Sequence, residues 1–144
     1  MKGWKYAAQI AYMGGGYSGW QRQKEALGVQ EVLEDALSRL SSVPVRVIGA
    51  GRTDKGVHAV GQMASFRMDR EWVPERLQLA ANFYLPEDVR IMRVHPVEGS
   101  FNARRSALWR EYRYFIWHGW VCPPHLNGLV WWRSEEHTSE LQSR

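Results

Sequence analysis

The first part of the chain shows two different spacings of hydrophobic side chains. Residues 4–12 alternate loosely between apolar or aromatic and polar side chains, and glycines follow at 14–16. This pattern predicts a strand that ends in a loop. Between Gly28 and Pro44, apolar residues recur at steps of three and four, which predicts a helix.

A pair of strands is predicted after this helix. Apolar residues at 45–48 indicate a second strand. Residues 57–68 alternate in part, with Gln62 interrupting the apolar face, and indicate a third. Residues 54–56 read Asp-Lys-Gly, and because aspartate and glycine are typical turn residues, we expect a hairpin there.

The same order of elements continues in the second part of the chain. Helical spacing between Pro74 and Pro86 predicts a second helix, and residues 89–97 and 112–117 predict two more strands. The order strand, helix, strand, strand, helix, strand, followed by one more strand, is typical of an α+β fold. We therefore expect a ferredoxin-like split βαβ sandwich, an antiparallel sheet with both helices on one face.

Composition supports one globular domain. The chain has 144 residues, of which 44% are hydrophobic and 24% charged, and a net charge of +4 that permits an acidic partner. The single cysteine, Cys122, forms no internal disulfide, and with five scattered histidines a structural zinc site is not expected. The amino-terminal apolar stretch is too short and interrupted for a signal peptide or membrane span, so we expect a cytoplasmic protein.

The last twelve residues differ in composition from the rest of the chain. Residues 133–144 read RSEEHTSELQSR, a polar run without apolar periodicity, directly after LVWW. The string resembles a translated sequencing adapter, and a natural disordered tail is the alternative. We therefore expect a native domain over residues 1–132 that is the amino-terminal part of a longer protein.

The candidate chemistry lies in the turn between the second and third predicted strands. Asp54 either caps this turn through its own backbone, or is held there as a nucleophile or base. Arg52 lies two positions earlier and shares the face of Asp54 on an extended backbone. The spacing of the two residues does not decide between these interpretations.

Three motifs point to a known family. Residues 51–59, GRTDKGVHA, resemble the signature of the TruA family of tRNA pseudouridine synthases. Two other segments agree in order and distance: YSGWQRQ at 17–23 followed by VQE at 29–31, and FNARRSA at 101–107 followed by Arg110, Tyr112 and Tyr114. The resemblance covers about residues 5–118.

The resemblance implies an isomerase that breaks the bond from uracil N1 to ribose, rotates the base and rejoins it through C5. It implies Asp54 as the nucleophile, with attack on sugar or ring left open, and neither cofactor nor metal. The substrate would be the anticodon arm of tRNA at positions 38 to 40, and the enzyme a homodimer. The fragment alone is expected to be inactive; the alternative is a catalytically silent ferredoxin-like RNA-binding module.

Further site residues follow from the same resemblance. Arg52 would help to take the place of the flipped base, and Tyr112 would lie beside that base, although a strand tyrosine is also commonly a core residue. His58 either approaches the RNA or satisfies the hairpin. Five other arginines are either phosphate contacts or solvated charges: Arg22, Arg104, Arg105, Arg110 and Arg113.

Overall fold

The computed structural model describes residues 3–133. The chain divides into two compact units, Met1–Arg110 and Glu111–Arg144, each of which is described by itself. The predicted adapter-derived tail lies, apart from Arg133, outside the described residues, so it stays a prediction. In the described part of the chain, no helix has the length and apolar character to cross a membrane.

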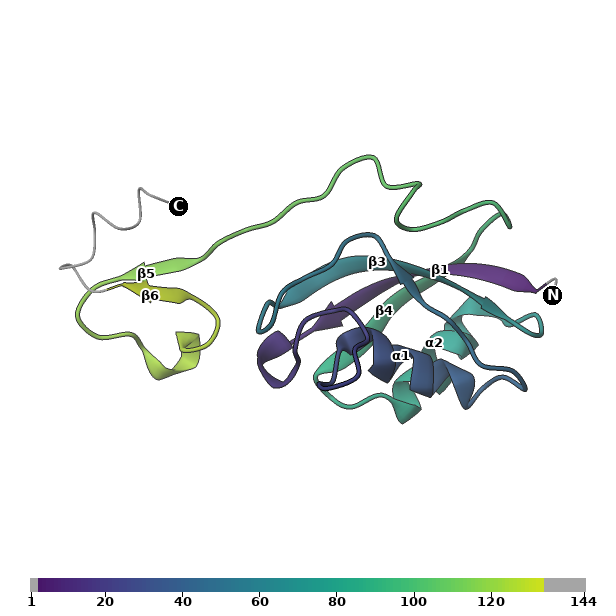
Figure 1. Cartoon of the computed structure of the whole chain (residues 1–144), viewed down its shortest axis with the longest axis horizontal. Coiled ribbons are helices and arrows are strands. Elements are labelled where there is room, and N and C mark those ends of the chain that lie inside the picture. Colours follow the sequence, from purple (N-terminus) through teal and green to yellow (C-terminus); the bar gives the residue numbers. More distant parts are fainter. Residues whose placement is uncertain (1–2, 134–144) are drawn as a thin grey trace. The chain divides into compact units, whose positions relative to one another are not determined.

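The first unit is an antiparallel sheet covered by two helices. Its strands have the order β2-β3-β1-β4, and each pair of neighbours is antiparallel. α1 connects β1 to β2 with β3 between them, and α2 connects β3 to β4 with β1 between them. Figure 1 shows both helices on the same side of the sheet. The predicted antiparallel α+β arrangement is therefore confirmed. The elements are β1 (Trp4–Tyr12), α1 (Val29–Ser38), β2 (Ile48–Gly49), β3 (Ala59–Met68), α2 (Pro74–Tyr84) and β4 (Val89–Pro96), with a 3-10 turn, η1 (Gly14–Gly16), after β1.

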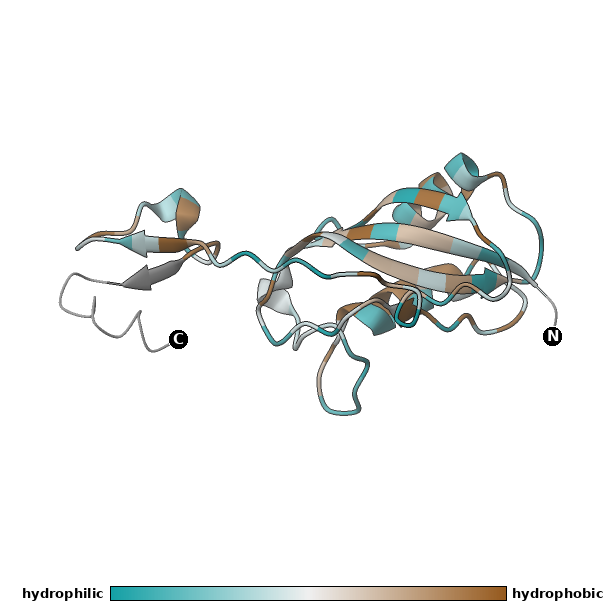
Figure 2. Ribbon diagram, turned by 90° about the horizontal axis from the view of Figure 1, so that it is seen from above, coloured by the Kyte–Doolittle hydropathy of each residue, from teal (hydrophilic) through white to brown (hydrophobic). Residues whose placement is uncertain are grey.

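Alternation along the strands explains which face of the sheet is buried. In β1 the buried core residues are Tyr6, Ala8, Ile10 and Tyr12, two positions apart, as the pleat requires. Polar and apolar residues alternate along the strands in Figure 2. The helices supply the other side of the core at helical spacing. The helix residues that are buried there are Val29, Leu33, Ala36 and Leu37 of α1 and Leu77 and Ala81 of α2.

The second strand is shorter than predicted. Val45 and Val47 are buried, but their N–H groups donate to the Ser38 hydroxyl (2.9 Å) and the Glu34 carboxylate (2.9 Å) of α1. Because these donors bond to helix side chains and not to a neighbouring strand, β2 is confined to two residues.

The opposite edge of the sheet is capped in a similar way. Ile91 in β4 donates its N–H to the Asn82 side-chain oxygen (2.8 Å) and accepts from the Asn82 amide nitrogen (2.9 Å). The Gln78 amide of the same helix donates to the carbonyls of Ile91 (3.2 Å) and Met92 (3.0 Å). Both edges therefore have part of their backbone occupied by side chains of α1 or α2.

The second unit contains a small parallel pair of strands, β5 (Ile116–His118) and β6 (Trp131–Arg133), with the turn η2 (Pro124–Leu126) between them. The strand predicted over residues 112–117 is thus present only from Ile116. In the described residues no strand pairs with residues 112–115, and this lack of a partner explains the difference.

Candidate functional site

The loop that carries Asp54 joins β2 to β3 and is anchored to the end of β1. The Trp20 N–H donates to the Thr53 carbonyl (3.1 Å), and the hydroxyl groups of Tyr12 and Thr53 lie 2.7 Å apart. The residue directly before Asp54 is therefore held by both its backbone and its side chain. The predicted hairpin is present: β2 and β3 pair antiparallel, the Ala50 N–H donates to the Met63 carbonyl (2.8 Å), and residues 50–58 form the loop that contains the Asp-Lys-Gly turn.

The other side of the loop is anchored too. Within it, the Val57 N–H donates to the Asp54 carbonyl (3.1 Å), and Gly56 takes the positive φ of +83° that such a turn needs. The Gly14 N–H donates to His58 Nδ1 (2.7 Å). A Cβ on Gly14 would lie 2.0 Å from the Val57 carbonyl oxygen, so only glycine permits this approach. His58 therefore links the Asp54 loop to the turn after β1, and its contact with RNA stays a prediction.

The Asp54 carboxylate itself points to no protein partner. Asp54 and Arg52 are both exposed, and among residues 3–133 neither side chain makes a hydrogen bond or ion pair. A carboxylate on a fixed loop, open to solvent, is available to attack a carbon atom or accept a proton. The exposed arginine two residues earlier adds a cation that can stack on a base or bind a phosphate.

A second loop, residues 17–28, supports the Asp54 loop from the protein side. Gly19 has a φ of +86°, and a Cβ there would lie 2.5 Å from the Thr53 carbonyl oxygen. Trp20 is buried; its indole lies against Gly49, where a Cβ would come within 2.6 Å, and its ring centroid is 6.2 Å from that of Tyr12. The sequence motif around Trp20 therefore has a packing role in this structure.

A polar network ties the same loop to α1. Arg22 Nε donates to Glu34 (2.6 Å), whose other carboxylate oxygen accepts from the Val47 N–H (2.9 Å). The Gln30 side chain bridges the same segments, accepting from the Arg22 N–H (2.8 Å) and donating to the Val47 carbonyl (2.7 Å). The hydrogen bond to Glu34 is the main reason that the pKa of Arg22 is raised. Arg22 thus has a structural role, and its contact with RNA stays a prediction.

Sequence reasoning missed Glu34 and Gln30. Their spacing of four residues places them on one face of α1, which is the available signal, but nothing in the sequence identifies Arg22 and Val47 as partners.

The carboxy-terminal motif of the first unit folds back towards the start of the Asp54 loop. Arg110 Nε donates to the Ala50 carbonyl (2.6 Å), and its Nη2 donates to the Arg104 carbonyl (3.2 Å). The N–H groups of Arg104 and Arg105 both donate to the Asn102 side-chain oxygen (3.0 Å each), while the two arginine residues are exposed. Arg110 therefore contacts the start of the loop, and within residues 3–133 none of these three arginines forms an ion pair with Asp54.

Tyr112 belongs to the second unit and is 55% exposed. Arg113 in that unit pairs with Glu111, with Nε and Oε1 2.7 Å apart. Because the two units are described separately, the predicted position of Tyr112 beside the flipped base stays a prediction.

One further residue anchors the loop after β1. The Tyr17 hydroxyl donates to Asp88 (2.6 Å), and the Met13 N–H donates to the Asp88 carbonyl (2.9 Å). Burial, and then the hydrogen bond to Asp88, raise the pKa of Tyr17. Tyr17 is therefore a neutral hydrogen-bond donor that holds the loop. No group of three or more histidine, cysteine, aspartate or glutamate side chains forms a metal site within residues 3–133.

The fold and the fixed aspartate loop can now be compared with known proteins. Residues 8–104 match the family described as tRNA pseudouridine synthase, and the chain belongs to this family. The matched range contains both helices and the whole loop that carries Arg52 and Asp54. The family resemblance predicted from the three motifs is thus confirmed.

Three bacterial proteins illustrate the similarity. The chain is 43% identical over 126 residues to tRNA pseudouridine synthase A of Methylacidiphilum infernorum, covering 88% of this chain and 49% of that protein. It is 40% identical over 131 residues to tRNA pseudouridine synthase A of Francisella tularensis subsp. novicida (91% and 51% covered), and 42% over 129 residues to that of Methylobacterium sp. strain 4-46 (89% and 51% covered). The chain therefore spans about half the length of the curated relatives it matches.

Proposed function

We propose that this chain is the amino-terminal half of an isomerase that converts uridine to pseudouridine in tRNA, with Asp54 as the nucleophile. The observation that carries the proposal is the combination of rigidity and exposure. The loop is bonded on both sides of Asp54, through Thr53 and His58, while the carboxylate has no partner within residues 3–133. Family membership supplies the reaction for which such a carboxylate is suited.

The isomerisation exchanges one glycosidic bond for another. The bond from N1 to C1′ of the ribose breaks, the base rotates, and a bond from C5 to C1′ forms. The hydrogen on C5 leaves as a proton, N1 gains a proton, and no oxidant or reductant is consumed. A covalent adduct with Asp54 divides this exchange into two easier steps, whether the carboxylate attacks the sugar or the ring.

The target base must first leave its stack. Extrusion of a stacked nucleotide costs a few kcal/mol, which the protein offsets with contacts made to the displaced base and to the vacated space. Arg52 is exposed on the same loop as Asp54, and its guanidinium plane is suited to stacking in the vacated space or binding a phosphate. We assign the uridines that reach this loop to positions 38 to 40 of the anticodon arm.

The remainder of the catalytic centre lies in the half of the relatives that this chain does not span. We propose that this half supplies the basic partner of Asp54, that Tyr112 joins the pocket, and that the complete cytoplasmic enzyme is a homodimer. The expected inactivity of the fragment follows from the same proposal.

Tritium release tests the proposal, because a hydrogen at C5 is lost only when the base is rejoined through that carbon. The substrate is a tRNA transcript labelled at C5 of uridine. The chain is assayed alone and joined to the complementary half of the Methylacidiphilum infernorum relative. We expect release by the joined protein only, and complete loss of release in its Asp54→Asn variant.

The matched control is Asp35→Asn, which makes the same change at an exposed position on α1. It should leave tritium release within about twofold of the parent. Release that persists in Asp54→Asn would refute the nucleophile, and tRNA binding without release by the joined protein would favour the RNA-binding module.

A further inference from the structure

The sheet face opposite the helices carries an unusual pair of like charges. Lys5 of β1 and Arg67 of β3 lie directly opposite each other in the antiparallel register. Side chains at such positions have Cβ atoms roughly 4.5–5.5 Å apart, and like charges there destabilise a sheet. Neither residue is on the core face, which in β1 carries Tyr6 and its alternate neighbours.

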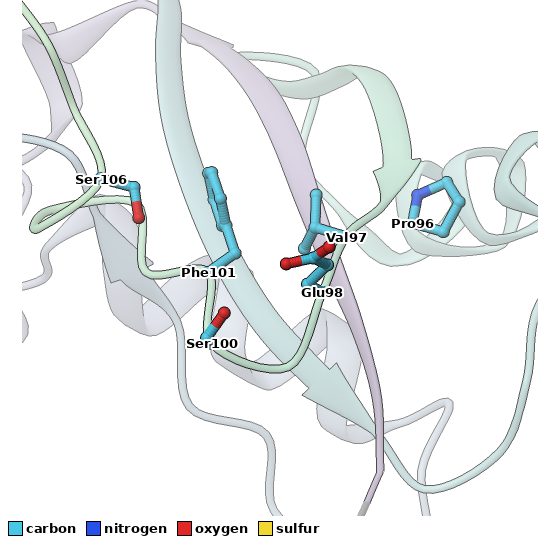
Figure 3. Close-up of a pocket in the computed structure, with 6 residues that line it drawn as sticks. All are labelled: Pro96, Val97, Glu98, Ser100, Phe101 and Ser106. Atoms are coloured by element: carbon cyan, nitrogen blue, oxygen red, sulfur yellow. The ribbon is translucent and has the colours of Figure 1, made fainter.

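The segment after β4 brings a third cation to this pair. It crosses the open face, as Figure 3 shows, with Val97 and Phe101 in front of the strands and the helices behind them. The Arg67 guanidinium donates to the Gly99 carbonyl (2.6 Å), and the Ala103 N–H donates to the buried Ser65 hydroxyl (3.0 Å). Ser65 lies two residues from Arg67 on the same face, so Ala103 is held beside the pair. Arg105 follows two residues later and is close enough to Lys5 to affect its charge.

No acidic side chain neutralises these three cations. Within residues 3–133, no carboxylate oxygen lies within 4.0 Å of the charged nitrogens of Lys5, Arg67 or Arg105, in contrast to Arg22, which has three acidic neighbours. Glu98 lines the groove beside them without forming an ion pair. The pKa of Lys5 is lowered, first by burial and then by Arg67 and Arg105. The protein thus keeps a local excess of positive charge on this face, although the three cations repel one another.

We propose that Lys5, Arg67 and Arg105 form a binding site for backbone phosphates of RNA, separate from the Asp54 loop. The name phosphate site is used below for these three residues. That the polyanion is tRNA rests on the proposed function. Arg93, exposed and opposite Gln9 in the register, adds a fourth cation on the same face, further along the strand towards the Asp54 loop.

Strand geometry gives the distance between the two sites. Lys5 and Tyr12 are seven residues apart on β1, and at roughly 3.4 Å per residue they are separated by about 24 Å. Tyr12 contacts Thr53, the neighbour of Asp54. A phosphate at this site therefore belongs to a nucleotide well away from the target uridine, and the contact contributes to affinity and orientation but not to the reaction.

Salt dependence of binding tests the proposal. Fluorescein-labelled tRNA transcript is titrated with the 144-residue chain by fluorescence anisotropy between 50 and 300 mM NaCl. In the triple variant Lys5→Met, Arg67→Met, Arg105→Met, loss of three phosphate contacts should reduce the slope of log K against log salt by about 2, at roughly 0.7–0.9 per contact. The same arithmetic gives about a 100-fold weaker affinity at 0.1 M salt.

Two further triple variants serve as controls. Lys24→Met, Arg46→Met, Arg76→Met removes the same charge from exposed positions outside this face, and should change the slope by less than 1. Lys5→Arg, Arg67→Lys, Arg105→Lys keeps the charges and should restore the parental slope. Circular dichroism shows which variants are folded.

Three results would overturn the phosphate site: equal slopes for the two methionine triples, loss of slope in the charge-preserving triple, or no RNA binding by the parent chain. The outcome is separate from that of the nucleophile. Asp54→Asn should keep the parental slope, so a negative result in the tritium-release assay does not count against the phosphate site. Conversely, an unchanged slope in the Lys5→Met, Arg67→Met, Arg105→Met variant does not count against Asp54 as the nucleophile.

Discussion

Gly19 holds the Asp54 loop by allowing a close approach that no other residue permits. Replacement by alanine has two separate costs. The φ of +86° is unfavourable for a residue with a Cβ by about 1–2 kcal/mol. In addition, the new Cβ would lie 2.5 Å from the Thr53 carbonyl oxygen, a backbone atom, and such overpacking costs about 1–3 kcal/mol. The free energy of unfolding should therefore fall by about 2–5 kcal/mol.

Two other glycines separate these costs. Gly56 has nearly the same φ, +83°, but a Cβ there meets nothing within 4 Å, so Gly56→Ala should cost only about 1–2 kcal/mol. Gly15 has neither a positive φ nor a close neighbour, and Gly15→Ala should be close to neutral. The difference between Gly19→Ala and Gly56→Ala measures the close approach to the backbone of the Asp54 loop, of which the Thr53 carbonyl oxygen is the nearest atom.

Urea unfolding of the 144-residue chain, followed by tryptophan fluorescence, gives all three values. We expect the order Gly15→Ala, Gly56→Ala, Gly19→Ala from least to most destabilising. If Gly19→Ala and Gly56→Ala destabilise the chain equally, then the loop at residues 17–28 does not approach the Asp54 loop as closely as described. In that case Gly19 does not support Thr53.

Two predictions concern the polar contacts that fix the loops. Glu34→Gln should destabilise the chain by about 1.5–3 kcal/mol, because it weakens a charge-assisted hydrogen bond to Arg22, and Arg22→Met should add little further loss in a double-mutant cycle measured by urea unfolding. Hydrogen bonds from the Ser42 hydroxyl and then from the Ser42 N–H lower the pKa of Asp69. The contribution of Asp69 to stability is therefore present above the unfolded-state pKa of about 3.9 and is lost as the pH falls through the lower folded-state value. Asp69→Asn should therefore be less stable than the parent at pH 6 and approach it at pH 2; a stability gap that is the same at both pH values would contradict this assignment.

The helices were predictable because glycine and proline mark their ends. The pattern placed a helix between Gly28 and Pro44 and another between Pro74 and Pro86, and α1 and α2 lie within those limits. Apolar spacing also predicted their buried faces. Local sequence was sufficient there because the signals for a helix and its ends lie within a few turns of each other.

The segments around β2 were less predictable. Residues 45–47 are as apolar as a strand, but their backbone partners are side chains of α1, which periodicity does not reveal. The hairpin between β2 and β3 was predictable because aspartate and glycine are typical turn residues, and the turn is present. The contacts that hold its loop, to Tyr12, Gly14 and Trp20, were not predictable because these residues are distant in sequence.

The candidate site was identified by motif and not by pattern. From the turn residues alone, Asp54 could be either a cap of the turn or a nucleophile. The resemblance over three motifs favoured the nucleophile. The phosphate site had no motif. It depends on the register that pairs Lys5 with Arg67 and on the path of residues 97–106 across the sheet, and both are properties of the folded chain.

The capped edges of the sheet have a consequence for how this polypeptide is made. In the proposed complete enzyme, this chain leaves the ribosome before the second half exists, and bare strand edges at that stage can pair with other nascent chains. Here Glu34 and Ser38 occupy backbone donors beside β2, while Asn82 occupies both backbone groups of Ile91. On this proposal, the side chains of α1 and α2 protect the sheet edges against misassembly until synthesis is complete.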